Sequence, residues 1–87
     1  MSPQELSDMV KRQPFEPFRI VMTDGQGYDI RHPELLMVGT RVAIVGLTTQ
    51  PAQTLFERHV LVDLLHVIRI EPLPAAAPPT GNGAAGS

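Results

Sequence analysis

The chain has no cysteine, and its 87 residues include only one tyrosine and three phenylalanines. Without cysteine it can form neither a disulfide nor a thiolate nucleophile, and a Cys₄-type zinc site is excluded as well. The scarcity of aromatic side chains disfavours a stacking platform for single-stranded nucleic acid. Neither a covalent cross-link nor a zinc–thiolate centre therefore holds this fold together.

Long apolar runs and a large excess of charge are also missing. No run approaches the roughly 20 apolar residues that span a bilayer, and Met1–Glu5 lacks the basic start and apolar stretch of a secretory signal. We therefore expect a cytoplasmic protein without membrane contact. The formal net charge of −2 argues against a strongly cationic nucleic-acid binder, although it leaves room for a locally basic ring or loop.

Residues 74–87 are almost entirely Pro, Ala, Gly, Ser, Thr and Asn. This composition predicts a disordered tail, because it offers no large apolar side chain to bury. Residues 1–73 then form a single small domain. A domain of this size buries only about 60% of its unfolded surface, so it needs either a well-packed core or self-association.

Residues 3–13 carry the signals of a short N-terminal helix. Ser2 is a good N-cap, Pro3 suits the first helical position, and Glu5 completes a capping box. Because so short a helix is unstable alone, its apolar stripe is expected to dock on the rest of the domain. The stripe consists of Leu6, Met9 and Val10.

Five strands are predicted after the helix, with short connections between them. Asp24 and Gly25 form a hairpin turn, and Pro33 is expected to bend the second strand. The last connection contains neither Gly nor Pro, and Asp63 is expected to cap it as a one-turn step. The predicted strands are 18–23, 28–38, 41–47, 55–62 and 67–71.

These elements predict a mainly β fold of the α+β class, in which a short helix precedes a five-stranded, strongly bent antiparallel sheet. One short helix cannot cover both faces of such a sheet. The sheet is therefore expected to wrap on itself as a small barrel. The apolar positions to be covered are Leu36, Val38, Val42, Ile44, Leu61, Leu64, Leu65, Ile68 and Ile70.

The order of elements resembles the Sm-like small barrel of the Sm, LSm and Hfq-type proteins. In this chain Met22–Gly25 resembles the first turn of that barrel, and Val62–Val67 resembles its final one-turn step. The resemblance covers about residues 3–72 and implies an RNA-binding fold. In that family the RNA contacts come from a loop after the second strand and a loop before the fifth.

The corresponding loops here are Val38–Arg41 and Asp63–His66. The first has no Asn and the second has no Arg-Gly pair, unlike the loops of the family. Because Arg41 and His66 lie in these two loops, the resemblance implies that they would face the pore of a ring and contact RNA or a nucleotide.

The chain is also similar to a group of short uncharacterised bacterial proteins of planctomycete type. The shared motifs are Pro-Phe-x-Pro-Phe, Asp-Gly, His-Pro-Glu and Val-Asp-Leu-Leu-His-Val, which here are residues 14–18, 24–25, 32–34 and 62–67. This resemblance is more specific than the first, and it implies no particular activity.

No motif predicts catalysis, a metal site or a cofactor. The three histidines, His32, His59 and His66, show no metal-ligand spacing. No nucleophile, base and orienting group can be recognised together. His32-Pro33-Glu34 is better suited to fix a bend than to act as an acid–base pair. The chain is therefore expected not to be an enzyme.

Five arginines could form a phosphate-binding stripe. Acidic residues lie within two positions of three of them, which favours mixed ion pairs on a solvated face instead. The arginines are Arg19, Arg31, Arg41, Arg58 and Arg69, and the nearby acidic residues are Asp29, Glu57 and Glu71.

Two functions remain open. The first is a non-enzymatic, homo-oligomeric interaction module that assembles by pairing the fourth and fifth strands of neighbouring copies, as a ring or a dimer, with weak RNA binding. The second is a monomeric accessory domain that binds another protein through an exposed sheet edge or through the N-terminal helix.

Overall fold

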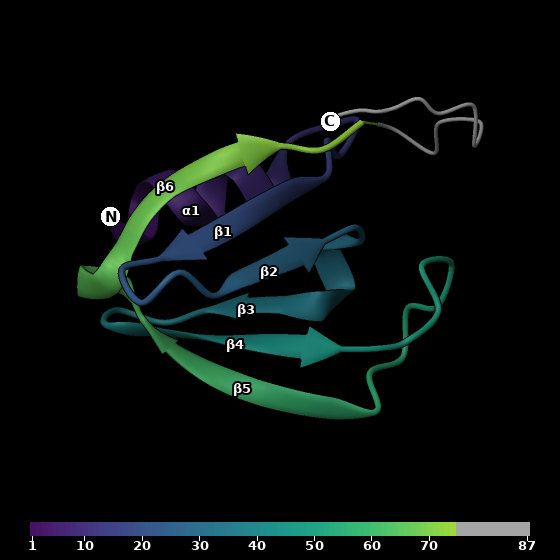
Figure 1. Cartoon of the computed structure of the whole chain (residues 1–87). Coiled ribbons are helices and arrows are strands. Elements are labelled where there is room, and N and C mark those ends of the chain that lie inside the picture. The colour runs from purple at the N-terminus through teal and green to yellow at the C-terminus, as the bar shows by residue number, and fades with distance from the viewer. Residues whose placement is uncertain (75–87) are drawn as a thin grey trace.

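The computed structural model describes residues 1–74, so the predicted tail at 74–87 lies outside the described residues except for Pro74. Within this range, one α-helix, α1 (Pro3–Lys11), precedes six strands and two single-turn 3₁₀ helices (Figure 1). The strands are β1 (Phe18–Met22), β2 (Gly27–Ile30), β3 (Leu36–Val38), β4 (Val42–Leu47), β5 (Arg58–Asp63) and β6 (Val67–Pro72). The 3₁₀ helices are η1 (Pro33–Leu35) and η2 (Leu64–His66).

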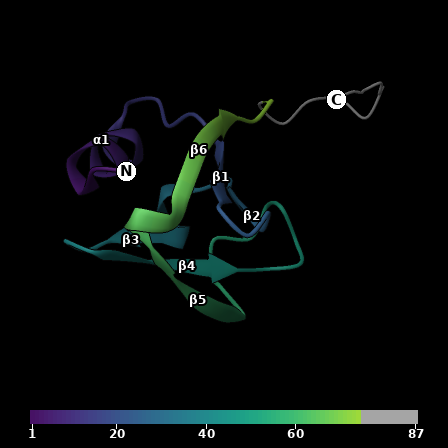
Figure 2. The same ribbon diagram turned by 60° about the vertical axis from the view of Figure 1, so that its left-hand side comes forward.

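The strands form two antiparallel sheets of three strands each. The first has the order β2-β1-β6 and the second the order β3-β4-β5. The chain passes from the first sheet to the second through η1 and returns through η2. Figure 2 shows the two sheets at an angle to one another, with α1 beside them. The mainly β class and the single short helix agree with the sequence prediction.

The prediction of five strands in one sheet was wrong at residues 28–38. This segment is divided into β2 and β3 by η1, which has Pro33 at its first position and a hydrogen bond from the Leu35 N–H to the His32 carbonyl. Pro33 has no N–H to donate to a ladder, so the strand pairing ends there.

The sheets do not close into a barrel. Within residues 1–74, η2 joins β5 to β6, but no ladder pairs these two strands, because β5 pairs only with β4 and β6 only with β1. The outer edges of β5 and β6 are consequently unpaired in this part of the chain. β5 forms the margin of the molecule in both views (Figures 1 and 2).

The turns between these strands follow from local chemistry. Gly25 has a φ of 90°, a left-handed conformation that glycine adopts without steric cost. The Asp24 carboxylate accepts a hydrogen bond from the Gln26 N–H at 2.9 Å. Asp63 lies at the N-cap of η2, where its Oδ1 accepts from the Leu65 N–H at 2.9 Å.

η2 is hydrogen bonded to both sheets. The Leu64 N–H donates to the Arg41 carbonyl at 2.9 Å, next to β4, and the His66 carbonyl accepts from the Thr23 N–H at 2.8 Å, next to β1. The Leu64 side chain is buried. The step therefore fixes the position of one sheet relative to the other.

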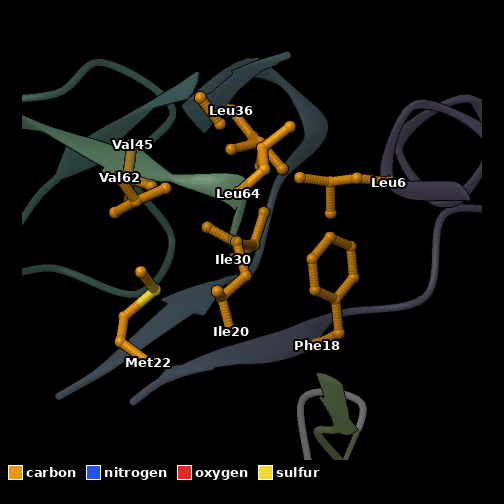
Figure 3. Packing of buried hydrophobic residues seen from close by; sticks show 10 residues of the cluster. Leu6, Phe18, Ile20, Met22, Ile30, Leu36, Val45, Val62 and Leu64 are labelled. Carbon is orange, nitrogen blue, oxygen red and sulfur yellow. The ribbon is translucent and has the colours of Figure 1, made fainter. Parts of the chain in front are cut away.

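The core lies between the inner faces of the two sheets and is closed on one side by α1 (Figure 3). The capping box between Ser2 and Glu5 starts the helix. Leu6 is the one residue of α1 that is fully buried, and it faces Phe18 of β1. The buried cluster comprises Leu6, Phe18, Ile20, Met22, Ile30, Leu36, Ala43, Val45, Val62 and Leu64.

Within residues 1–74, no helix has the length and apolar character needed to cross a membrane.

Replacement of Leu6 by Ala should lower the free energy of unfolding by about 2–5 kcal/mol, because it leaves a cavity where α1 meets the sheets. Leu65→Ala is the matched control, since Leu65 is 84% exposed and its truncation should cost about 0.5 kcal/mol or less. Urea denaturation followed by circular dichroism measures both values. Equal losses for the two variants would contradict the docking of α1 described above.

Candidate functional site

The outward face of the second sheet carries an apolar row. Met37 of β3 lies opposite Ile44 of β4, and Ile44 lies opposite Leu61 of β5. Opposed residues of antiparallel strands point to the same side of the sheet. These three residues, which we call the outer apolar row, therefore form one line across the sheet that ends at the unpaired edge of β5.

The outer apolar row faces away from the core. The inward positions of the same strands, Ala43 and Val45 of β4 and Val62 of β5, are buried. Met37 and Leu61, in contrast, are 68% and 66% exposed. A β-strand places successive side chains on opposite faces, so the buried set and the exposed set are the two faces of a single sheet.

Two further apolar side chains border this row. Val42 is partly exposed and pairs with Asp63. Phe56, in the loop before β5, lies against Gly46, since a Cβ added there would be 2.8 Å from the Cβ of Phe56. The ring of Phe56 also meets that of His59 edge-on, with centroids 6.2 Å apart. The exposed apolar surface thus extends from β3 across β4 to the loop before β5.

The outward face of the first sheet is charged instead. Arg19 of β1 forms a salt bridge to Asp29 of β2 at 2.6 Å and approaches Glu71 of β6 at 4.0 Å. Arg69 and Arg31 pair with the same two carboxylates, at 2.7 Å to Glu71 and 3.6 Å to Asp29. The hydrogen bond that Arg19 donates to Asp29, followed by charge attraction to that carboxylate, raises the pKa of Arg19 above its ordinary value.

Of the three arginines with an acidic residue within two positions, Arg31 and Arg69 form the predicted ion pair, and Arg19 forms a further pair across the sheet. For the pair Glu57 and Arg58 the prediction was wrong, because the Glu57 carboxylate accepts from the Thr49 N–H and hydroxyl instead. Within residues 1–74, neither Arg41 nor Arg58 has an ion-pair partner. A continuous basic stripe does not form on the described surface.

Arg41 and His66 lie at the same end of the molecule. The Arg41 carbonyl accepts from the Leu64 N–H, two residues before His66. The two side chains border different hollows, however: Arg41 lines a groove with Met1 and Leu65, and His66 lines another with Thr23. The His66 Nε2 is 4.0 Å from the Asp63 Oδ2.

The histidines have separate surroundings. The His32 Nε2 is 2.8 Å from the Pro51 carbonyl, which ties the loop after β4 to the segment before η1. His59 contacts Phe56, and His66 faces Asp63. Among the described residues, no three His, Asp or Glu side chains form a group that could hold a metal ion.

The expectation that a wrapped sheet covers all the apolar strand positions was wrong. Leu61, Leu65 and Ile68 are mostly exposed, whereas Leu36 and Leu64 are buried. Alternation in a sequence distinguishes the two faces of a strand, but it cannot tell whether a second layer covers the outer one. Within residues 1–74 no second layer covers the outer face of the second sheet that carries Leu61, and Leu65 of η2 and Ile68 of β6 also face solvent.

Comparisons of the chain with protein-family models, with curated proteins and with solved structures give no match.

Neighbouring residues of β5 should respond very differently to truncation. Val62→Ala should lower the free energy of unfolding by about 1–3 kcal/mol, because Val62 is 4% exposed and leaves a cavity. Leu61→Ala removes more carbon but should cost about 0.5 kcal/mol or less, because Leu61 already faces solvent. The comparison requires urea titrations at low protein concentration, where association adds nothing to stability. A larger cost for Leu61 would contradict the assigned faces.

Proposed function

We propose that this protein is a non-enzymatic interaction module that self-associates through the outer apolar row and the adjacent edge of β5. The observation that carries the proposal is the row itself. Met37, Ile44 and Leu61 are aligned by register and lead directly to an unpaired strand. Contiguous exposed apolar surface is typical of a site where a protein contacts another macromolecule.

The edge of β5 supports the same conclusion. Natural sheets commonly protect an edge strand with lysines, prolines or inward-pointing charges, because its free N–H and C=O groups can pair with another chain. The middle of β5 is Val60-Leu61-Val62, and its charged residues Arg58 and Asp63 stand at the two ends. Such an edge is suited to strand pairing with a partner.

We assign the module to the Sm-like type, in an open form. Support comes from the strand order and from the single-turn steps η1 and η2, which carry the chain between the sheets where that fold bends its strands. In a ring of this type β5 of one copy pairs with β6 of the next. Ring and dimer are both forms of the proposed self-association.

Membership of the planctomycete-type bacterial group belongs to the same proposal. Its support is that three of the shared motifs coincide with places where the chain changes direction. Asp24-Gly25 makes the β1–β2 turn, residues 32–34 lead into η1, and residues 62–67 contain η2. Motifs at such positions would give the related chains the same backbone path.

The monomeric alternative uses the same edge for a different occupant. A partner protein could add a strand to β5 or lie on the half-exposed side of α1. In that case the chain alone would stay monomeric at every concentration, so the oligomeric state separates the two functions.

RNA binding at Arg41 and His66 is a second candidate function. It is favoured by their position at one end of the molecule, and by the absence of an ion-pair partner for Arg41 within residues 1–74. The net charge of −2 limits it to weak, local contact.

Sedimentation velocity of the full chain should show association that increases up to high micromolar concentration. Leu61→Glu should abolish it, because the substitution places a carboxylate in the outer apolar row. Gln26→Glu adds the same charge on the exposed β1–β2 turn and should leave association unchanged. A strictly monomeric wild-type chain at high micromolar concentration would rule out self-association and leave the accessory-domain function.

A mobility-shift assay with labelled single-stranded RNA at low salt tests the second candidate. Weak binding should occur and should decline as salt increases. Arg41→Gln should reduce the slope of log affinity against log salt by about 0.7, the contribution of one phosphate contact to a single strand. Arg12→Gln, on α1's exposed C-terminal end, should leave the slope unchanged if Arg41 is the contact. Absence of any shift at low salt would eliminate RNA binding.

A further inference from the structure

We infer that the occupant of the β5 edge is a second copy of this chain, paired antiparallel with Leu61 opposite Leu61 of the other copy. The inference rests on the proposed self-association and adds the partner, the strand and the register. It differs from a ring of Sm-like type, in which β5 would pair with β6, because here the same strand pairs with itself about a two-fold axis.

Alternate residues of β5 direct their backbone N–H and C=O groups away from β4. The Leu64 N–H donates to the Arg41 carbonyl, and Val42 lies opposite Asp63 in the register of β4 and β5. In an antiparallel ladder, alternate residues direct their N–H and C=O groups toward the same neighbour. Val60 and Val62 therefore direct theirs toward β4. The open edge receives the N–H and C=O groups of His59 and Leu61. The N–H of Asp63 also faces this edge.

The register centred on Leu61 joins these outward groups of two copies. A two-fold axis perpendicular to the sheet keeps the inner faces of both copies on one side, so each residue must pair with one of the same face. With Leu61 opposite its own copy, His59 lies opposite Asp63 and Val60 opposite Val62. Each pair then joins side chains of the same face, and the hydrogen-bonding residues are those at the open edge.

Apolar contact supports this register. The outer apolar row of one copy meets the same row of the other, so that Met37, Ile44 and Leu61 continue without interruption into Leu61, Ile44 and Met37 of the second copy. On the inner face, half-buried Val60 gains Val62 of the second copy as a neighbour. The β3-β4-β5 sheets of the two copies join into one continuous sheet.

Charge complementarity supports it independently. The His59 imidazole lies opposite the Asp63 carboxylate of the other copy, and the two-fold axis produces this pair twice. Asp63 is half-exposed, and its Oδ1 caps η2. Its Oδ2 lies 4.0 Å from the His66 Nε2 of its own chain, which is beyond hydrogen-bond distance, so this oxygen can still accept a hydrogen bond. A protonated or neutral imidazole can donate to it.

Neighbouring registers are less favourable. A centre at Val60 would also use the outward groups of His59 and Leu61, but it would place Leu61 opposite His59 and so lose both the Leu61–Leu61 contact and the pairing of His59 with Asp63. A centre at Asp63 would place two carboxylates directly opposite each other, which destabilises a pair of strands. A centre at His59 would place Leu61 opposite Glu57, outside β5. Only the centre at Leu61 combines free backbone groups, apolar contact and complementary charge.

Disulfide trapping tests the register, because the chain has no cysteine and any introduced thiol is unique. Hydrogen-bonded antiparallel residues have Cα atoms about 5.5 Å apart, which is within the range of about 4.4–6.8 Å that a disulfide spans. The full-length Leu61→Cys variant should therefore form a covalent dimer rapidly under mild oxidation. The band should persist on non-reducing gels and disappear with reductant.

Met37→Cys is the matched control. Met37 is as exposed as Leu61, 68% against 66%, and belongs to the same row. In the inferred dimer, however, the two copies of Met37 are five strand spacings apart, roughly 24 Å at about 4.8 Å each. Its cross-linking should stay at the collisional rate, at least about tenfold slower than that of Leu61→Cys, because a separation of roughly 24 Å exceeds any disulfide span.

A charge series provides a second measurement that does not depend on trapping. His59→Glu places like charges opposite Asp63 twice per dimer and should raise the dimer dissociation constant about tenfold. His59→Lys places a cation opposite Asp63 and should leave the constant unchanged or lower it. Both are measured by sedimentation equilibrium of the full chain.

The outcomes separate the two proposals. A monomeric wild-type chain overturns self-association and this inference together. Association with equal cross-linking of Leu61→Cys and Met37→Cys, or into assemblies larger than a dimer, preserves self-association and overturns the β5–β5 register. A dimer with selective trapping at position 61 and the expected charge series supports the register.

Discussion

The single-turn step η2 is the constraint on which the rest of this fold depends. Asp63 caps it, the Leu64 side chain anchors it in the core, and its backbone bonds to Arg41 and Thr23 hold one end of each sheet. Within residues 1–74 the chain crosses from β5 to β6 without a ladder between them, so these contacts act together with the shared core to fix the relative position of the sheets. Among the described residues, the same step leaves the edge of β5 unpaired and therefore available to a partner.

The two outer faces of the molecule have opposite chemistry. Charged residues of β1, β2 and β6 neutralise one another on the first sheet, whereas the second sheet presents the outer apolar row. Water solvates the first face at little cost, but each exposed apolar side chain of the second favours burial. For a domain too small to bury much surface alone, association through the second face is a direct way to gain stability.

Much of the local structure could be predicted from residue chemistry. The capping box at Ser2, the turn at Gly25, the bend near Pro33 and the one-turn step after Asp63 all depend on interactions within a few residues. The strand count was not predictable to the same degree. Whether Pro33 merely bends a strand or ends it depends on the neighbouring strand with which that segment would pair, and this partner lies elsewhere in the chain.

The sequence by itself determined which residues alternate, where the chain turns and how the helix begins, because those features follow from short-range sterics and hydrogen bonding. Only the tertiary structure decided that Met37, Ile44 and Leu61 align, and that no other part of residues 1–74 covers their side of the sheet. Alignment across strands is set by register between distant segments, and coverage is set by which other segments pack on the sheet. Neither quantity is encoded within a single strand.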